Sequence, residues 1–254
     1  MKKLFSAMVG LAALALTSCA TYFSEHYQGA LKGNAKDQWA IATCYRDGDG
    51  GVPGGKVDME EALKWFRKSA EQGYGNALDD LGMLYMEGKG VPENLETAAR
   101  YFEMAAQRGN KYGQSHLGDA YISLAYGDGG YAEGEESHVY FARCHEKAAY
   151  WYSKAAAQGL ADAQYELAQC YESAAENNLS AARHGVYINL GGDSKSLQAY
   201  WLQAEKWYKA AAPQGSKYKE AYERFKRTGS AFFSNSGSVY GRGHEYMKLV
   251  ARFL

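Results

Sequence analysis

The hydrophobic positions of the chain recur in four blocks that end in the same way. In each block an alanine lies eleven residues before a glycine, an aromatic pair begins eight residues before it, and a small pair lies four and three residues before it. Spacings of three, four and seven residues fall on one helical face, so each block predicts an amphipathic helix, here named helix B. The closing glycine is typical of the left-handed residue just past a helix end. The blocks are Ala62–Gly73, Ala98–Gly109, Ala148–Gly159 and Ala204–Gly215. We expect the first members of the aromatic pairs to occupy equivalent buried places in successive repeats; they are Trp65, Tyr101, Trp151 and Trp207.

A second apolar pattern precedes each helix B and predicts a partner, helix A. It starts four residues after a glycine and places an aliphatic residue, a small residue and a tyrosine at fixed spacing. The small residue allows a neighbouring helix to approach closely. The repeating unit is therefore helix A, a loop and helix B. The four patterns are Asp37-Ile41-Ala42-Tyr45, Ala77-Leu81-Gly82-Tyr85, Gly113-Leu117-Gly118-Tyr121 and Ala163-Leu167-Ala168-Tyr171.

The loops between helix A and helix B differ in length, and this is where the repeats carry insertions. Asp58 and Asn94 stand where helix B begins and are suited to cap it. The third and fourth copies are enlarged over residues 122–143 and 177–196, and insertions confined to one loop are what stacked repeats tolerate. These insertions form a second candidate surface for a partner, with the tyrosines Tyr126, Tyr131, Tyr140 and Tyr187.

The combined pattern resembles the Sel-1-like repeat family, whose members are related to tetratricopeptide repeats. It covers residues 33–229, and the second copy (Ala77–Gly109) matches most completely. The resemblance implies an all-α fold, a right-handed α-solenoid of about four helix-pair repeats, and a role in assembling protein complexes, often in bacterial envelopes. Residues 216–228 predict one further helix that caps the open end, as a solenoid requires. Residues 229–240 look like a loop.

The N-terminus indicates export. Lys2 and Lys3 precede an apolar stretch from Leu4 to Leu16, too short to span a membrane and the right length for a signal peptide. The sequence Leu16-Thr17-Ser18-Cys19 resembles a bacterial lipobox, which implies cleavage before Cys19 and its lipidation. An ordinary signal with an incidental cysteine is the alternative. We expect a signal peptide at 1–18, a tether at 19–32, the solenoid at 33–229 and a tail at 230–254.

The balance of charges limits the classes of molecule that the protein is expected to bind. The formal net charge is −1, and nucleic-acid binding needs a basic footprint, so no nucleic acid is expected. The partner is expected to be another protein or peptide segment, with the membrane contacted through the lipid anchor alone. In Gram-negative lipoproteins, which the N-terminus resembles, a residue other than Asp after the cysteine favours the outer membrane. Because Ala20 stands there, we expect the protein in the cell envelope, at the outer membrane facing the periplasm.

The candidate chemistry is sparse. Cys144 and Cys170 fall on consecutive predicted helices and are either a disulfide or two buried core thiols. His138 and His145 are seven residues apart, too far for one metal ion on a helix. Ser216 begins an S-x-x-K string without the companion motifs of penicillin-interacting enzymes. We therefore expect no catalytic residues, no metal and no cofactor, and we predict that the protein is not an enzyme.

A partner-binding surface is predicted on the side of helix A opposite its repeated apolar positions. This stripe is mildly acidic and suits an extended or helical segment that is neutral or basic; an ordinary solvated face is the alternative. The other functions considered are an envelope enzyme or enzyme regulator acting on peptidoglycan or β-lactams, and a surface-exposed host-interaction factor. The stripe comprises Ala40, Thr43, Asp80, Met83, His116, Asp119, Glu166 and Gln169.

Overall fold

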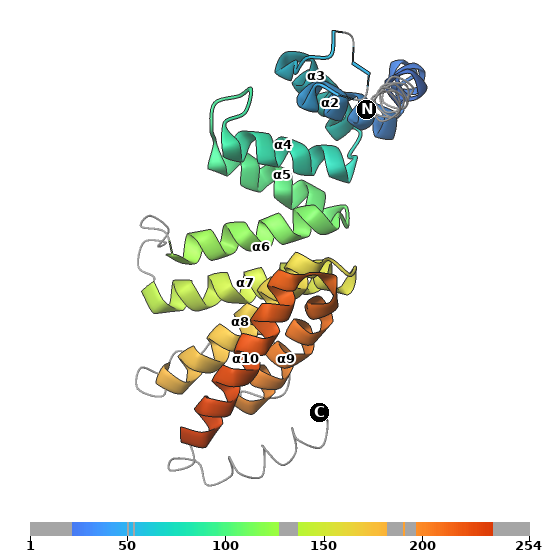
Figure 1. Cartoon of the computed structure of the whole chain (residues 1–254). Coiled ribbons are helices and arrows are strands. Elements are labelled where there is room, and N and C mark those ends of the chain that lie inside the picture. Colours follow the sequence, from blue (N-terminus) through green and yellow to red (C-terminus); the bar gives the residue numbers. More distant parts are fainter. Residues whose placement is uncertain are drawn as a thin grey trace, which may run out of the picture. The chain divides into compact units, whose positions relative to one another are not determined.

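The computed structural model of the chain confirms the all-α prediction. It describes residues 22–49, 51–52, 54–126, 137–181, 190 and 197–235, and every regular element in these ranges is a helix. The chain divides into two compact units at Ala120 and Tyr121. The elements, labelled in Figure 1, are α2 (Ala35–Asp47), α3 (Met59–Glu71), α4 (Gly75–Glu87), α5 (Leu95–Gln107), α6 (Lys111–Tyr126), α7 (Ser137–Ala157), α8 (Ala161–Ala181), α9 (Leu197–Ala211), the 3₁₀ turn η1 (Ala212–Gln214) and α10 (Ser216–Asn235).

The helix pairs of the first unit begin and end as predicted. The side chains of Asp58 and Asn94 accept hydrogen bonds from backbone N–H groups in the first turns of α3 and α5. The backbone N–H of each also donates to the carbonyl of the tyrosine in the last turn of helix A, over 2.8 Å to Tyr45 and 2.9 Å to Tyr85. Each cap therefore fixes the start of helix B and ties it to the preceding helix A.

The core lies between helices A and B. Within each aromatic pair, however, the more deeply buried residue is not the one that was predicted. The first members were expected to be the equivalent buried residues, yet Tyr101, Trp151 and Trp207 are half-buried, and among the first members Trp65 alone is buried. The second member of each pair is nearly inaccessible to solvent. These second members are Phe66, Phe102, Tyr152 and Tyr208, with exposed fractions of 0%, 2%, 1% and 0%.

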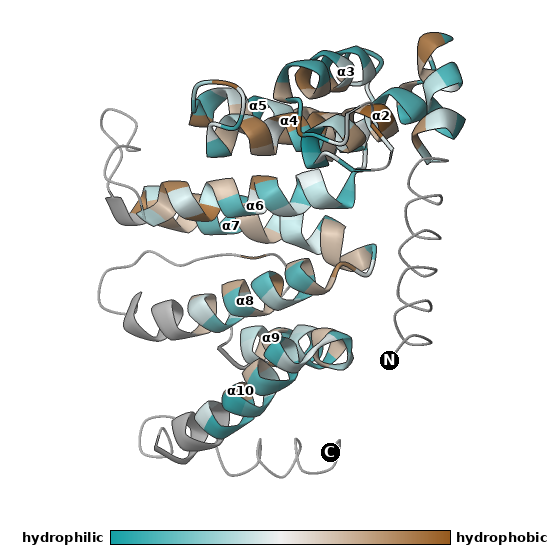
Figure 2. Cartoon of the chain, turned by 45° about the horizontal axis from the view of Figure 1, so that its top comes forward, coloured by the Kyte–Doolittle hydropathy of each residue, from teal (hydrophilic) through white to brown (hydrophobic). Residues whose placement is uncertain are grey.

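Glycines inside helix A allow the close packing that the sequence predicted. A Cβ at Gly82 would lie 2.5 Å from the ring of Phe102, and a Cβ at Gly113 would lie 2.4 Å from the Cβ of Ala105. Real carbon atoms do not approach so closely, so these glycines let α5 pack against α4 and α6. As Figure 2 shows, hydrophilic and hydrophobic residues alternate around the helices, in keeping with one buried face on each.

The prediction of a tether at residues 19–32 is wrong for residues 22–31, which form a helix. Phe23 and Ala30 are buried in the core of the first unit, where Phe23 packs edge-on against Tyr45. The Gln38 amide donates to the carbonyl of Ala30 over 3.2 Å. Gln114 and Gln164 make the same bond, over 3.3 Å, to Ala106 and Ala156 at the ends of α5 and α7. The first helix therefore packs as a helix B and covers the apolar face of the first repeat.

The second unit also departs from the prediction at its end. Gly33, Gly73, Gly109 and Gly159 have the expected left-handed backbone, with φ between 76° and 91°. Gly215 does not, since Pro213 in η1 turns the chain first and leaves Gly215 extended, with φ 169°. The capping helix α10 is confirmed, and Tyr222 and Phe225 bury its inner face against α9. It continues to Asn235, so the expected loop and tail begin too early.

The two enlarged loops are partly helical. The insertions lengthen α6 at its end, α7 at its start and α8 at its end. Of their other residues the structure describes residue 190, and Tyr131 and Tyr187 lie outside the described ranges. Tyr140 is buried and so is not available on a surface, whereas Tyr126 is 67% exposed and packs edge-on against Phe141. Among the described residues, no helix combines the length and apolar character needed to cross a membrane.

Candidate partner-binding groove

The predicted stripe does not form one continuous solvated face. Ala40 is 1% exposed, so it cannot contact a partner, and the Thr43 hydroxyl donates to the Ala40 carbonyl within its own helix. Asp119 is exposed. Asp80, Met83 and His116 are half-buried, as are Glu166 and Gln169 in the second unit, where the Gln169 amide donates to Glu166 over 3.2 Å. Whether these residues bind a partner stays a prediction.

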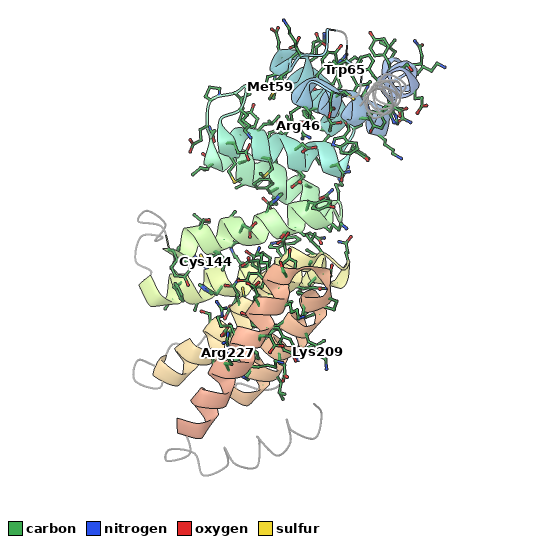
Figure 3. The ribbon with its side chains drawn as sticks, viewed as in Figure 1. Arg46, Met59, Trp65, Cys144, Lys209 and Arg227 are labelled. Carbon is green, nitrogen blue, oxygen red and sulfur yellow. The ribbon has the colours of Figure 1, made fainter. Side chains whose placement is uncertain are left out.

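Two stripe residues, Asp80 and Met83, do meet in a groove of the first unit. The groove has a volume of about 590 Å³ and lies between the end of α2, the start of α3, the second half of α4 and the loop that follows it. Arg46 and Met59, on two of its walls, are labelled in Figure 3. We call it the α2–α4 groove. Its lining residues are Arg46, Asp47, Val57, Met59, Asp80, Met83, Leu84, Glu87, Lys89 and Gly90.

The lining combines apolar residues with charged ones. Leu84 is buried, Met59 and Met83 are half-buried, and Val57 is 59% exposed. The three carboxylates and two cations of the lining carry a formal charge of −1. An unbranched methionine adapts its shape to what it contacts, so Met59 and Met83 suit a binding surface.

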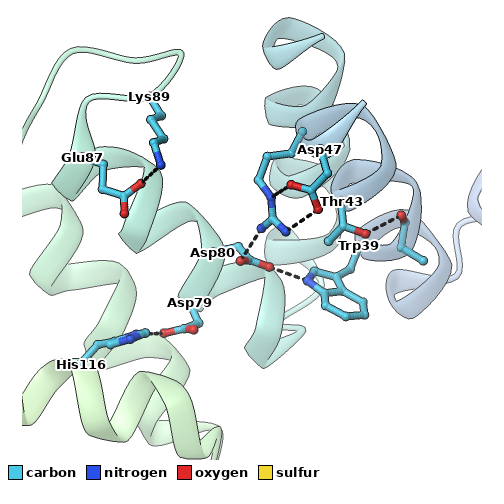
Figure 4. A network of polar contacts seen from close by, with 10 residues as sticks. Trp39, Thr43, Asp47, Asp79, Asp80, Glu87, Lys89 and His116 are labelled. Carbon is cyan, nitrogen blue, oxygen red and sulfur yellow. Dashed lines mark hydrogen bonds and ion pairs between the residues drawn. The ribbon is translucent and has the colours of Figure 1, made fainter. Parts of the chain in front are cut away.

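A polar network fixes one wall of the groove (Figure 4). The Arg46 guanidinium donates to both carboxylate oxygens of Asp47, over 2.8 and 3.0 Å, and to Asp80 over 2.9 Å. The Trp39 indole donates to the second oxygen of Asp80 over 2.6 Å. Asp80 therefore joins two side chains of α2 to α4. Lys89, in the loop after α4, pairs with Glu87 at the end of that helix over 2.7 Å.

The surroundings of the Asp80 carboxyl shift its pKa in opposing directions. Burial raises the pKa of the Asp80 carboxyl above its usual value, although the Trp39 hydrogen bond and the nearby Arg46 favour the ionised form. The hydrogen bond from Arg46 to Asp47 raises the pKa of the guanidinium, which stays charged. Asp80 is thus a paired, structural carboxylate, and the carboxylate of Asp47, 45% exposed, is the more accessible one.

A second ionic contact links the next pair of A helices. His116 on α6 and the buried Asp79 on α4 approach to 2.8 Å between Nδ1 and Oδ1, and the His116 ring packs on Phe102. Burial alone would lower the pKa of His116. The hydrogen bond to Asp79 and the charges of Asp79, Asp119 and Asp80 outweigh it and raise the pKa above the usual value.

Sequence reasoning missed most of the groove. Val57, Lys89 and Gly90 lie in loops, where a helical periodicity gives no information. Arg46 and Asp47 end α2 and fall outside the repeated positions. The signal that could have found them is the pairing of Arg46 with Asp80, thirty-four residues later, about one repeat apart.

The other candidate residues lie on helices. Cys44, Cys144 and Cys170 are buried, as the core alternative predicts. The buried His145 ring donates to the Phe141 carbonyl over 3.1 Å, and burial lowers its pKa. Among the described residues, no three His, Cys, Asp or Glu side chains gather as a metal ion would need. Ser216 begins α10, and its neighbour Lys217 pairs with Asp162 over 3.4 Å.

A family model matches four segments of the chain. Residues 35–74, 75–110, 145–160 and 161–184 are similar to the Sel1 repeat. Together these segments make up a little less than half of the chain. Three of the matched segments begin at the first residue of a helix A, namely α2, α4 and α8. The unmatched segment between the second and third matches, 111–144, contains α6 and the insertion at residues 122–143, where the loop departs from the family pattern.

Known proteins share these repeats over part of their length. The crystal structure of a Sel1 repeat protein from Oxalobacter formigenes is similar with a TM-score of 0.55 and 25% identity, over 78% of this chain and 65% of that one. A chitin synthase regulator of Saccharomyces cerevisiae is 34% identical over 36% of this chain. A component of an ERAD-associated E3 ubiquitin-protein ligase of Arabidopsis thaliana is 37% identical over 37% of it. The matches span 13% and 14% of these two relatives.

Proposed function

We propose that this protein is a protein–protein interaction scaffold of the bacterial cell envelope, and that the α2–α4 groove binds a segment of its partner. One observation carries the proposal: Met59, Met83 and Val57 line the same open groove as exposed carboxylates. An apolar side chain of the partner packs on the methionines, and a basic or neutral neighbour meets Asp47 and Glu87. The partner segment is therefore neutral or basic with at least one large apolar residue.

The Sel1 relatives support a binding role over a catalytic one. Their names describe a regulator of chitin synthase and a component of a ubiquitin ligase. The identity is confined to the repeats, so it supports the scaffold and leaves the partner of this chain to be determined. We infer that the partner is another protein and that the chain itself performs no reaction.

The location in the envelope rests on the N-terminal sequence. We propose that the chain is cleaved before Cys19, that Cys19 is lipidated, and that the protein lies at the outer membrane facing the periplasm. Metabolic labelling with palmitate tests the anchor. Label should appear in the wild type and disappear in Cys19→Ala, and a labelled Cys19→Ala chain would contradict the assignment.

The binding role is tested by a pair of methionine variants on one helix. Met83 lines the groove, while Met86, three residues later on α4, is 38% exposed and lies outside the lining. Chemical crosslinking in intact envelopes, followed by mass spectrometry, identifies partners of the wild type, Met83→Glu and Met86→Glu. Loss of a partner in Met83→Glu alone supports the groove. The same partners in all three chains would contradict it.

A further inference from the structure

A row of basic side chains and one tyrosine follows the exposed side of α7, in the second unit. Arg143, Lys147, Tyr150 and Lys154 are all exposed, and they stand at positions i, i+4, i+7 and i+11. With 3.6 residues per turn these positions lie on one face, over a length of roughly 16 Å. We call them the α7 stripe. Tyr150 is 54% exposed and lies between the second and third cations.

Each cation of the α7 stripe lies over an aromatic ring. The distances to the ring centroids are 5.5 Å from Arg143 to Tyr140, 5.1 Å from Lys147 to Tyr121, and 5.3 Å from Lys154 to Tyr150. A ring face attracts a cation without cancelling its charge. The rings therefore restrict where the ammonium groups of Lys147 and Lys154 lie and leave both of them charged.

The B helices of the first unit are different. On α3 Lys64 pairs with Glu61 over 2.8 Å, and on α5 Arg100 pairs with Glu96 over 2.7 Å. Helix α7 has one acidic residue, Glu146, which is half-buried beside the stripe. The exposed charges of α3 and α5 are thus mixed in sign, as on an ordinary solvated helix, whereas Lys147 and Lys154 are two exposed charges of one sign on the same face of α7.

We propose that the α7 stripe binds an acidic segment of another protein. Carboxylates of that segment pair with Lys147 and Lys154, and an apolar side chain packs on the Tyr150 ring between them. This surface is separate from the α2–α4 groove, so the proposal goes beyond the proposed function. The protein carries a formal charge of −1, so net charge would not attract an acidic partner, and the local row of cations must do so.

The apolar content of this face favours a protein over a lipid surface. A helix that lies in a membrane interface buries a large apolar face between its basic residues. Next to the cations, α7 exposes Val139 and Tyr150 as large apolar residues, with exposed fractions of 39% and 54%. That area suits one side chain of a peptide better than the acyl boundary of a bilayer.

The test uses the full chain and a synthetic fluorescent peptide of defined sequence. The peptide is helix-forming, carries glutamates one and two turns apart and has a central leucine; its binding is followed by fluorescence anisotropy. We compare the wild type with Lys147→Glu/Lys154→Glu. The control, Lys36→Glu/Lys219→Glu, makes the same charge change at two exposed lysines outside the stripe. A third chain, Lys147→Gln/Lys154→Gln, removes the charge, and circular dichroism checks that each variant is folded.

The expected result is saturable binding that weakens at least about tenfold in the stripe variant and changes by less than about threefold in the control. Met83→Glu should leave it unchanged, which separates this surface from the groove. Absence of saturable binding, or equal loss in both charge variants, would overturn the proposal. Vesicles containing phosphatidylglycerol form a second arm; if they bind through Lys147 and Lys154 and the peptide does not, the surface recognises lipid instead.

Discussion

Arg46 and Asp80 form an ion pair of 2.9 Å between two successive A helices, and this contact connects the architecture to the groove. The carboxylate lies in one repeat and the guanidinium in the repeat before it. Because Asp80 also accepts a hydrogen bond from Trp39, it is satisfied within the protein and partly withdrawn from solvent. Reversing its charge would disturb the packing of α2 on α4 as well as any partner contact.

We therefore expect Asp80→Ala to destabilise the protein. The change leaves the Trp39 indole and one side of Arg46 without their acceptor, which should lower the free energy of unfolding by about 1–3 kcal/mol. Asp119→Ala, at an exposed stripe position, should change it by less than about 0.5 kcal/mol. Urea unfolding measures both. Equal effects would show that the Asp80 network does not stabilise the first unit.

The contact of His116 with Asp79 predicts a pH dependence of stability. The pKa of His116 is raised in the folded state, so folding favours the protonated ring. The stabilisation is fully present below the unfolded pKa of about 6.5 and is lost as the pH rises through the higher folded pKa. Unfolding free energies between about pH 5 and 8 should fall more steeply for the wild type than for His116→Gln. Parallel curves would contradict the assignment.

The closing glycines predict a position-dependent cost of adding a methyl group. Gly109 has φ 79° with open space around it, so Gly109→Ala should cost about 1–2 kcal/mol through backbone strain alone. Gly215 is extended, and Gly215→Ala should cost less than about 0.5 kcal/mol. Thermal unfolding of both variants distinguishes them. A cost at Gly215 as large as that at Gly109 would mean that the fourth repeat closes like the others.

The helix at residues 22–31 should stabilise the first repeat. Phe23→Ala removes a buried ring from the core and should cost about 3 kcal/mol or more, while Gln28→Ala, at an exposed position of the same helix, should cost little. Unfolding in urea tests the pair. If Phe23→Ala unfolds like the wild type, the segment is dispensable, as a tether would be.

The sequence predicted the helices well because their faces repeat. Caps such as Asp58 and Asn94 and the left-handed glycines follow from local rules, and the structure confirms them. Which member of each aromatic pair is buried could not be predicted. Both residues fall on the apolar side of helix B, and the way the helices cross decides which one is buried. The first helix was missed although Gly29, Ala30 and Gly33 repeat the small pair and the closing glycine, because its aromatic residues do not match.

The groove was harder to predict than the fold. Asp80 and Met83 follow from helical periodicity, but Val57 and Lys89 reach the groove through loops whose paths depend on the whole structure. The predicted partner-binding stripe included Ala40, although this residue is buried. A helical periodicity shows on which side of a helix a residue lies, but it does not show which element packs against that side. Burial of Ala40 arises from packing that the repeat pattern does not specify.

The central claim is that the α2–α4 groove holds a segment of a partner protein. A photoreactive amino acid placed at position 83, and in a separate chain at position 86, tests it directly after irradiation of intact envelopes. The account predicts that position 83 crosslinks to a discrete partner at a neutral or basic segment and that position 86 does not. Equal crosslinking from both positions, or none from position 83 while the chain is folded and exported, would contradict it.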